Sequence, residues 1–114
     1  MSFELHDYVR HMLVEVDFLI HSSAAVNREE FLQSEVLQRA FVRSIEVIGE
    51  AAKQIPEDFR ALHSKIEWRA MAGMRDHLIH GYFGVDYEIV WDVAKEKAPE
   101  LRRQLERILG SEPR

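Results

Sequence analysis

Apolar residues recur at steps of three and four along most of the 114-residue chain, and this period limits the possible folds more than any other feature. The first such segment runs from Phe3 to about His21, and its apolar members are Leu5, Val9, Met12, Leu13, Val16, Leu19 and Ile20. This spacing is typical of one face of an amphipathic α-helix. No segment alternates apolar and polar residues over the length of a β-strand, so the sequence predicts an all-α protein.

A second helix is expected to begin after Asn27 and to run to about Gln54. Asn27 is a favourable N-cap residue, Glu30 completes a capping box three positions later, and Val26 and Phe31 are placed to form a hydrophobic staple. The apolar stripe of this helix consists of Leu37, Phe41, Ile45, Ile48, Ala52 and Ile55.

The opposite face of the same helix is charged, and its members are Arg39, Arg43, Glu46, Glu50 and Lys53. Opposite charges one turn apart support each other modestly, so we expect a solvated surface with weak ion pairs. Gly49 lowers helix stability by up to about 1 kcal/mol relative to alanine. We therefore expect a neighbouring helix to approach closely at Gly49.

Pro56 ends the second helix and can open a short one through Phe59 and Leu62. Residues 63–67 are expected to form a loop, and a third long helix is expected from Trp68 to about Tyr82.

The last helical segment begins after Asp86, another N-cap residue, and is expected to continue to about Lys97. Pro99 should kink or restart it, after which an apolar face reaches Gly110. Four to five helices with short connections indicate an up-and-down bundle. A length of 114 residues suits one domain, residues 1–114, with a single core.

Composition and charge exclude several classes of function. The chain has no cysteine, which excludes disulfides and thiolate chemistry and fits a reducing compartment. The net charge of -5 gives no overall attraction to nucleic acid, so RNA binding requires a local basic cluster. We expect neither an export signal nor a membrane span.

A motif of charged and titratable residues lies on the third long helix, where Arg75, His80 and Tyr82 have the spacing R-x-x-x-x-H-x-Y. Arg75 and Tyr82 lie within about 20° of each other on a mostly apolar face, so Arg75 requires a partner other than solvent. His80 lies about 140° from Arg75 around an ideal helix. The two meet only if the helix loosens before Gly81 or if a second copy of the chain supplies one of them. Asp76, one turn before His80, is placed to hold one ring nitrogen of that histidine.

An arginine and a histidine are the minimum for RNA cleavage without a metal ion, in which the 2′-hydroxyl attacks the adjacent phosphodiester. The histidine moves protons and the arginine stabilises the pentacovalent phosphate. A metal site is not expected, because only His77 and His80 are spaced as a pair at i and i+3, which is a weak ligand set. On the residues alone, structural roles for His80 and Tyr82 are an open alternative.

Three stretches of the chain resemble the HepT-like ribonuclease toxins, a branch of the HEPN superfamily of small all-helical proteins. They are residues 43–53, 68–86 and 89–92, which include the motif of Arg75, His80 and Tyr82. The resemblance implies a cytoplasmic toxin of a type VII toxin-antitoxin system of the HepT/MntA kind. It also implies a metal-independent endoribonuclease without a cofactor, working as a homodimer whose motif helices form one composite cleft. The RNA substrate, transfer or messenger RNA, stays open.

The resemblance also implies roles for individual residues. Arg75 and His80 take the catalytic roles, and Tyr82 is the site of modification. The implied antitoxin is a minimal nucleotidyltransferase, which uses ATP and Mg²⁺ to attach AMP to Tyr82. The supporting residues are expected to be Asp76, Arg43 and Glu46. The alternative is a non-catalytic HEPN module in which Arg75 and Tyr82 contact a nucleotide or a nucleotidyltransferase, and the negative net charge favours it slightly.

Overall fold

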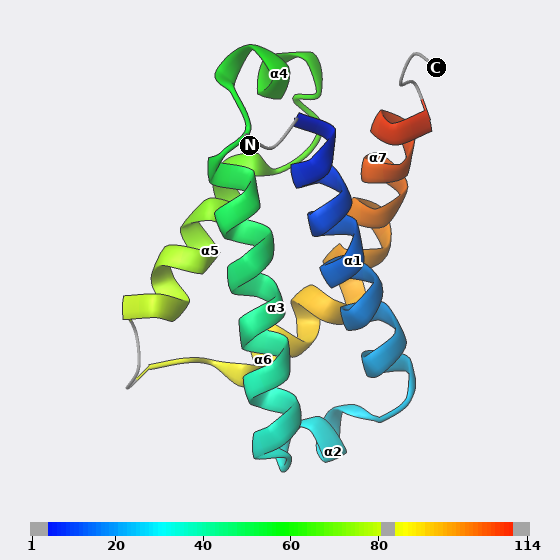
Figure 1. The fold of residues 1–114 in the computed structure, drawn as a ribbon. Coiled ribbons are helices and arrows are strands. Elements are labelled where there is room, and N and C mark those ends of the chain that lie inside the picture. Colours follow the sequence, from blue (N-terminus) through cyan, green and yellow to red (C-terminus); the bar gives the residue numbers. More distant parts are fainter. Residues whose placement is uncertain (1–4, 81–83, 111–114) are drawn as a thin grey trace.

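Long helical segments that run in alternating directions form the body of the molecule. The computed structural model describes residues 5–80 and 84–110, with the backbone only for Ile79 and His80. The segments are α1 (Leu5–Ala24), α3 (Glu35–Lys53), α5 (Trp68–His80) and a C-terminal run that ends in α7 (Ala98–Gly110). α1 packs against α3 and α7, and α3 has its most extensive contact with α5 (Figure 1). All secondary structure in the described residues is helical, which confirms the all-α prediction.

Three short helices complete the bundle. α2 (Arg28–Leu32) and α6 (Tyr87–Asp92) lie at the end where α1 passes into α3, and α4 (Glu57–Leu62) lies at the opposite end (Figure 1). A π-helical turn, η1 (Val93–Lys97), joins α6 to α7. Among the described residues, no helix combines the length and the apolar composition that crossing a lipid bilayer requires.

The core lies between α1, α3 and the C-terminal segment. The predicted stripe of α3 is buried at Phe41, Ile45, Ile48 and Ala52. Ile55, just past the end of α3, is also buried. An aromatic cluster anchors the end near α2, where the ring of Phe31 lies 4.7 Å from that of Phe41 and 5.3 Å from that of Trp91. These spacings are typical of packed aromatic pairs. The apolar period therefore identified the core-facing side of α3 correctly.

The helix predicted from Asn27 to Gln54 is in fact two helices, so that boundary was wrong. The capping box at Asn27 is present, with Asn27 Oδ1 accepting from the Glu30 amide at 2.8 Å and Glu30 Oε1 accepting from the Asn27 amide at 3.0 Å. The chain then breaks at Ser34, whose hydroxyl accepts from the Leu37 amide at 3.2 Å and caps α3. At a helix start, a serine hydroxyl accepts a hydrogen bond from an amide that has no partner within the helix. Serine is therefore more favourable at this position than inside a helix.

The first helix ends later than predicted, at Ala24 rather than about His21. Its predicted start at Phe3 lies outside the described residues. The buried Ser23 donates its hydroxyl proton to the Ile20 carbonyl at 3.2 Å. A serine that bonds back to its own preceding turn is compatible with continued helix, so the polar composition of this stretch did not end α1.

The predicted disturbance at Pro99 is present as a wide turn before the proline. The Ala98 amide donates to the Val93 carbonyl, which is the i to i+5 pattern of a π-helix. Proline has no amide proton, and in a regular α-helix its ring clashes with the carbonyl four residues earlier. The wide turn η1 moves that carbonyl aside, so α7 continues the same helical run.

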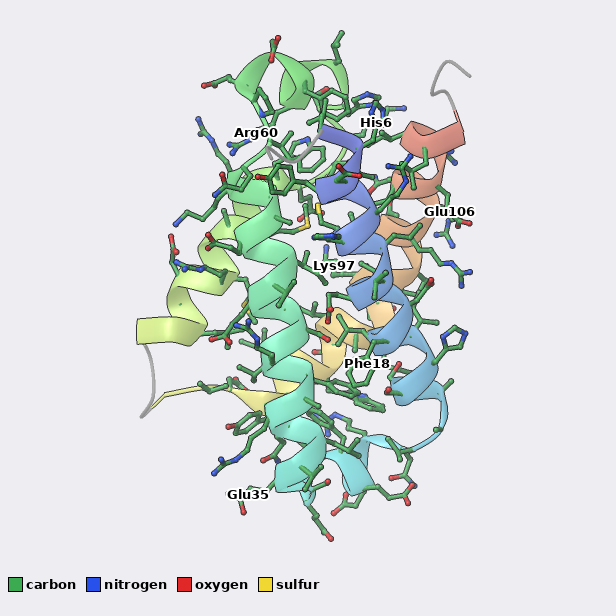
Figure 2. All side chains as sticks on the ribbon, viewed as in Figure 1. His6, Phe18, Glu35, Arg60, Lys97 and Glu106 are labelled. Atoms are coloured by element: carbon green, nitrogen blue, oxygen red, sulfur yellow. The ribbon has the colours of Figure 1, made fainter. Side chains whose placement is uncertain are left out.

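Arg60 attaches α4 to the bundle. Its Nε donates to the Ile55 carbonyl at 2.9 Å and its Nη2 donates to the Ala52 carbonyl at 3.0 Å. The Ala52 carbonyl also accepts from the Ile55 amide at 3.2 Å, so Arg60 adds a side-chain donor at the C-terminal end of α3. Figure 2 shows Arg60 between α4 and this end of α3.

Candidate active site

Arg75 lies at a close approach between α5 and α3. A Cβ atom built on Gly49 of α3 would overlap Cβ of Arg75 and would lie only 2.6 Å from the Met71 carbonyl oxygen. Any larger residue at Gly49 would therefore push the two helices apart. The predicted close approach of a helix at Gly49 is confirmed, and the approaching helix is the one that carries the motif.

The guanidinium group of Arg75 is held between two carboxylates. Its Nη2 lies 2.9 Å from Oε2 of Glu50 on α3, and its Nη1 lies 2.9 Å from Oδ1 of Asp76 on α5. The Arg75 side chain is 24% exposed, so its charge is partly withdrawn from solvent. The planar fork of an arginine keeps such partners in a fixed geometry. The expectation that Arg75 needs a partner other than solvent is confirmed.

Asp76 connects α5 back to α3. Its Oδ1 accepts hydrogen bonds from Arg75 at 2.9 Å and from Nζ of Lys53 at 3.1 Å. The hydrogen bonds from Arg75 and Lys53 hold the pKa of the Asp76 carboxyl group below its usual value of 3.8, because they favour the charged form. The predicted contact between Asp76 and the ring of His80 falls outside the described side chains.

The charged face of α3 was predicted to be a solvated surface with ion pairs within the helix. The structure confirms this for only part of the face. Arg39 and Glu35 form an exposed pair within the helix at 3.1 Å. Glu50 instead pairs with Arg75, and Lys53 pairs with Asp76, so the prediction of pairs within one helix was wrong for these two. Both residues lie within one turn of Gly49, where α5 is close enough to offer partners of its own.

A groove of about 250 Å³ opens beside Arg75 and is bounded by α1, α3 and α5. Its polar lining comes from Tyr8 and His11 on α1, from Arg43, Glu46 and Glu50 on α3, from Gln54 at the end of α3, and from Arg75. Nη1 of Arg43 lies 3.8 Å from Oε1 of Glu46, and the Glu46 side chain is only 19% exposed. The groove thus places two guanidinium groups among carboxylates.

The structure brings some of the predicted site residues together. Arg75, Arg43 and Glu46 line the groove, and Asp76 lies beside Arg75. His80 is the last residue of α5, where only its backbone is described. Tyr82 lies outside the described residues.

Sequence reasoning did not find Tyr8, His11, Glu50 or Gln54 as groove residues. The only local signal was that Tyr8 and His11 stand three positions apart on one side of a helix. That spacing does not reveal which other helix the side faces, because the answer depends on how the helices pack.

The chemistry available at this groove is the binding of an anion. The Arg75 fork suits two oxygens of one phosphate, and Arg43 is 75% exposed at the same groove. Within the part of the chain that the structure describes, no group of three or more histidine, aspartate or glutamate side chains is arranged to hold a metal ion.

A second cavity of about 250 Å³ lies between α3, α5 and the C-terminal segment. Its floor is apolar and is formed by Leu19, Ile45, Ile48 and Met71, with Lys65 and Lys97 among the lining residues. Arg75 does not line it. The groove beside Arg75 is therefore the candidate active site, because it alone of these two cavities contains a motif residue.

Comparisons with known proteins identify the family to which this chain is similar. A family described as "Ribonuclease HepT-like" matches residues 9–108. A protein of Caldanaerobacter subterraneus subsp. tengcongensis named "Putative RNase" is 50% identical over 105 residues, covering 92% of this chain and 94% of the relative. A "Probable ribonuclease HepT" of Thermococcus cleftensis is 41% identical over 102 residues, covering 90% and 93% of the two chains. Among solved structures, none matches significantly.

Proposed function

The chain belongs to the ribonuclease HepT-like family, and we propose that it is an endoribonuclease in which Arg75 and His80 cleave RNA without a metal ion. The observation that carries the proposal is the guanidinium group of Arg75, which ion pairs of 2.9 Å hold at the groove. It belongs to the motif R-x-x-x-x-H-x-Y. A forked donor that is always charged suits the oxygens of a phosphodiester.

The proposed reaction is an internal transfer of the phosphodiester bond. The 2′-oxygen attacks the adjacent phosphorus while His80 takes the hydroxyl proton. Arg75 donates hydrogen bonds to the non-bridging oxygens as negative charge grows on them. The bond from phosphorus to the 5′-oxygen then breaks, and His80 returns the proton to that oxygen. The products are a 2′,3′-cyclic phosphate and a 5′-hydroxyl, and no cofactor takes part.

In this proposal two copies of the chain share one cleft. His80 is about 140° from Arg75 around an ideal helix, so His80 of a second copy is better placed to work with Arg75 than His80 of the same copy. Asp76 fixes Arg75 through their 2.9 Å ion pair. Arg43 and Glu46, which line the groove, support the binding of RNA.

The proposed setting is a cytoplasmic toxin-antitoxin system. The antitoxin is a minimal nucleotidyltransferase that transfers AMP from ATP to the Tyr82 hydroxyl with Mg²⁺ and releases pyrophosphate. The position of Tyr82 in the motif supports this step. AMP adds bulk and a negative phosphate two residues after His80, and this charge repels the RNA phosphate. The modified toxin is therefore inactive.

RNA cleavage by the purified protein tests the ribonuclease. We expect cleavage in the presence of a chelator, with 2′,3′-cyclic phosphate ends, and a loss of at least about 100-fold in both Arg75→Ala and His80→Ala, since each removes one half of the chemistry. Arg69→Ala is the matched control, because Arg69 is an exposed arginine on the same helix. Retained cleavage in both motif variants would remove the catalytic assignment and leave the non-catalytic HEPN module that binds a nucleotide or a nucleotidyltransferase.

The intact mass of the protein tests the modification. Incubation with the cognate nucleotidyltransferase, ATP and Mg²⁺ should add one or more AMP units, and Tyr82→Phe should prevent most of the addition because it removes the accepting hydroxyl. Tyr87→Phe, five residues later, is the control and should be modified normally. An unchanged mass with an active partner enzyme would contradict the modification of Tyr82 but not the ribonuclease.

A further inference from the structure

The groove beside Arg75 extends beyond the arginine, along the side of α3 that faces α1. Glu46, Glu50 and Gln54 follow one another at steps of four along this side, which places them in one row. A phosphate held by Arg75 therefore has its attached nucleotide next to this row. The volume of about 250 Å³ is below the roughly 300–1,000 Å³ of sites that enclose drug-sized ligands, so it suits a single base rather than a longer stretch of RNA.

The two carboxylates in the row differ in what they are bonded to. Glu50 is 2.9 Å from Arg75. The carboxylate of Glu46 is 3.8 Å from Arg43, which is too long for a hydrogen bond. Within the described residues, no hydrogen bond to the Glu46 side chain is formed. A carboxylate that is only 19% exposed has acceptor capacity left for an N–H donor of a ligand.

The opposite wall of the groove comes from α1 and carries flat rings. Tyr8 and His11 line it, and proteins commonly stack unpaired RNA bases on tyrosine and histidine rings. A base that lies beside these rings is within the same groove as Glu46 and Gln54, which can bond to its edge. The same groove thus offers a stacking wall, an acceptor wall and a phosphate-binding arginine.

We propose that this groove is a nucleobase subsite, and that Glu46 selects a base with an exocyclic amino group over uracil at a nucleotide that adjoins the cleaved bond. An ionised carboxylate only accepts hydrogen bonds. Cytosine and adenine present an amino group to it, whereas uracil presents carbonyl oxygens that repel it on both sides of its single N–H. The selectivity rests on the proposed ribonuclease activity, but the binding of the base does not require cleavage.

Short oligoribonucleotides that differ at one base test the subsite. Cytosine is exchanged for uracil, and adenine for purine without its amino group, on either side of the cleaved bond. With the wild-type chain, kcat/KM should fall about tenfold when the amino group is lost. Glu46→Gln should bring the two members of each pair to nearly equal values, because an amide both donates and accepts.

Glu35→Gln is the matched control. Glu35 also pairs with an arginine of α3, at 3.1 Å, but it lies at the far end of the helix, next to α2 (Figure 2). This variant should keep the tenfold preference. Equal kcat/KM for cytosine and uracil in the wild type, or an unchanged preference in Glu46→Gln, would overturn the proposal.

Binding separates this proposal from the proposed cleavage. The inactive His80→Ala chain is titrated with the same cytosine and uracil oligonucleotides, and anisotropy reports the Kd. A preference for cytosine that disappears in the His80→Ala, Glu46→Gln double variant supports the subsite, even if the wild type cleaves no RNA. Equal Kd values for both bases would overturn the subsite, even if the wild type is an active ribonuclease.

Discussion

Arg75 reaches the groove with its charge already neutralised. Glu50 and Asp76 each lie 2.9 Å from its guanidinium group, so an RNA phosphate has to displace a carboxylate before it can use the full fork. Asp76 is also held by Lys53, whereas Glu50 is 52% exposed and has only Arg75 as an ion-pair partner in the described residues. Glu50 is therefore the carboxylate that leaves.

Glu50→Gln should strengthen RNA binding. The variant keeps the shape of the side chain and removes the charge that competes with phosphate, and an exposed ion pair contributes up to about 1 kcal/mol. KM should therefore fall by up to about fivefold while kcat is kept, as measured by steady-state cleavage. Glu67→Gln, which breaks an exposed pair with Lys97, should change neither value. A loss of activity in Glu50→Gln would instead mean that Glu50 positions Arg75.

The carboxyl group of Asp76 should titrate below 3.8 in the folded protein, because Arg75 and Lys53 bond to its charged form. These contacts stabilise the fold fully above the unfolded value near 3.8, and their contribution is lost as the pH falls through the lower folded-state pKa. An NMR titration of the Asp76 carboxyl carbon measures this. Lys53→Met should raise the midpoint toward 3.8, whereas Lys65→Met should leave it in place; an unchanged midpoint in Lys53→Met would contradict the contact.

At this scale the sequence predicted that Arg75 has a partner but not which one. The rules for pairs at i and i+4 consider one helix at a time, and the partner Glu50 comes from a different helix. Asp76 was predicted to hold a ring nitrogen of His80, so its hydrogen bonds with Arg75 and Lys53 were not foreseen.

The apolar period predicted where the long helices lie. It did not predict where they are interrupted. Ser34 has the same composition signal as any surface serine, and its capping role appears only once the backbone has turned there. The wide turn η1 was anticipated as a disturbance at Pro99, but a sequence period cannot distinguish a kink from an extra residue in one turn.

The crossing of α3 and α5 depends on Gly49. Alanine usually stabilises a helix by up to about 1 kcal/mol relative to glycine, but at Gly49 its Cβ would overlap Arg75. Gly49→Ala should therefore lower the free energy of unfolding by about 1–3 kcal/mol and reduce RNA cleavage, because Arg75 moves.

The control for Gly49→Ala is Gly73→Ala on α5. A Cβ atom at Gly73 meets nothing within 4 Å, so this variant should raise the free energy of unfolding by up to about 1 kcal/mol and keep activity. Denaturant unfolding and cleavage are measured for both. Equal stabilisation by the two substitutions would show that α3 and α5 do not approach closely at Gly49.

For the molecule as a whole, the bundle architecture was predictable and the groove was not. Periodic apolar faces and short connections fix which sides are buried. The groove forms because Tyr8 of α1, Glu46 of α3 and Arg75 of α5 lie close together. Their proximity depends on the angles at which the helices pack, which cannot be predicted from one segment alone.

Mixing two inactive variants tests whether the proposed cleft is shared. If Arg75 of one copy works with His80 of the other, Arg75→Ala and His80→Ala chains, mixed under conditions that allow exchange, form mixed dimers with one complete site. After random exchange, half of the dimers are mixed, and each mixed dimer has one intact site out of two. Roughly a quarter of the wild-type activity should therefore return. A mixture as inactive as its components would show that each chain uses its own pair of residues.

Because Arg60 attaches α4 to the end of α3, proteolysis at Arg60 can report how often α4 detaches from the bundle. α4 has no buried residue of its own, and the guanidinium group that a protease such as trypsin must bind is engaged with the carbonyls of Ala52 and Ile55. Cleavage after Arg60 therefore requires α4 to detach first, whereas the exposed Lys65 in the following loop can be cut without this step. The ratio of the two cleavage rates measures how often the end of α3 beside the groove loses its cap.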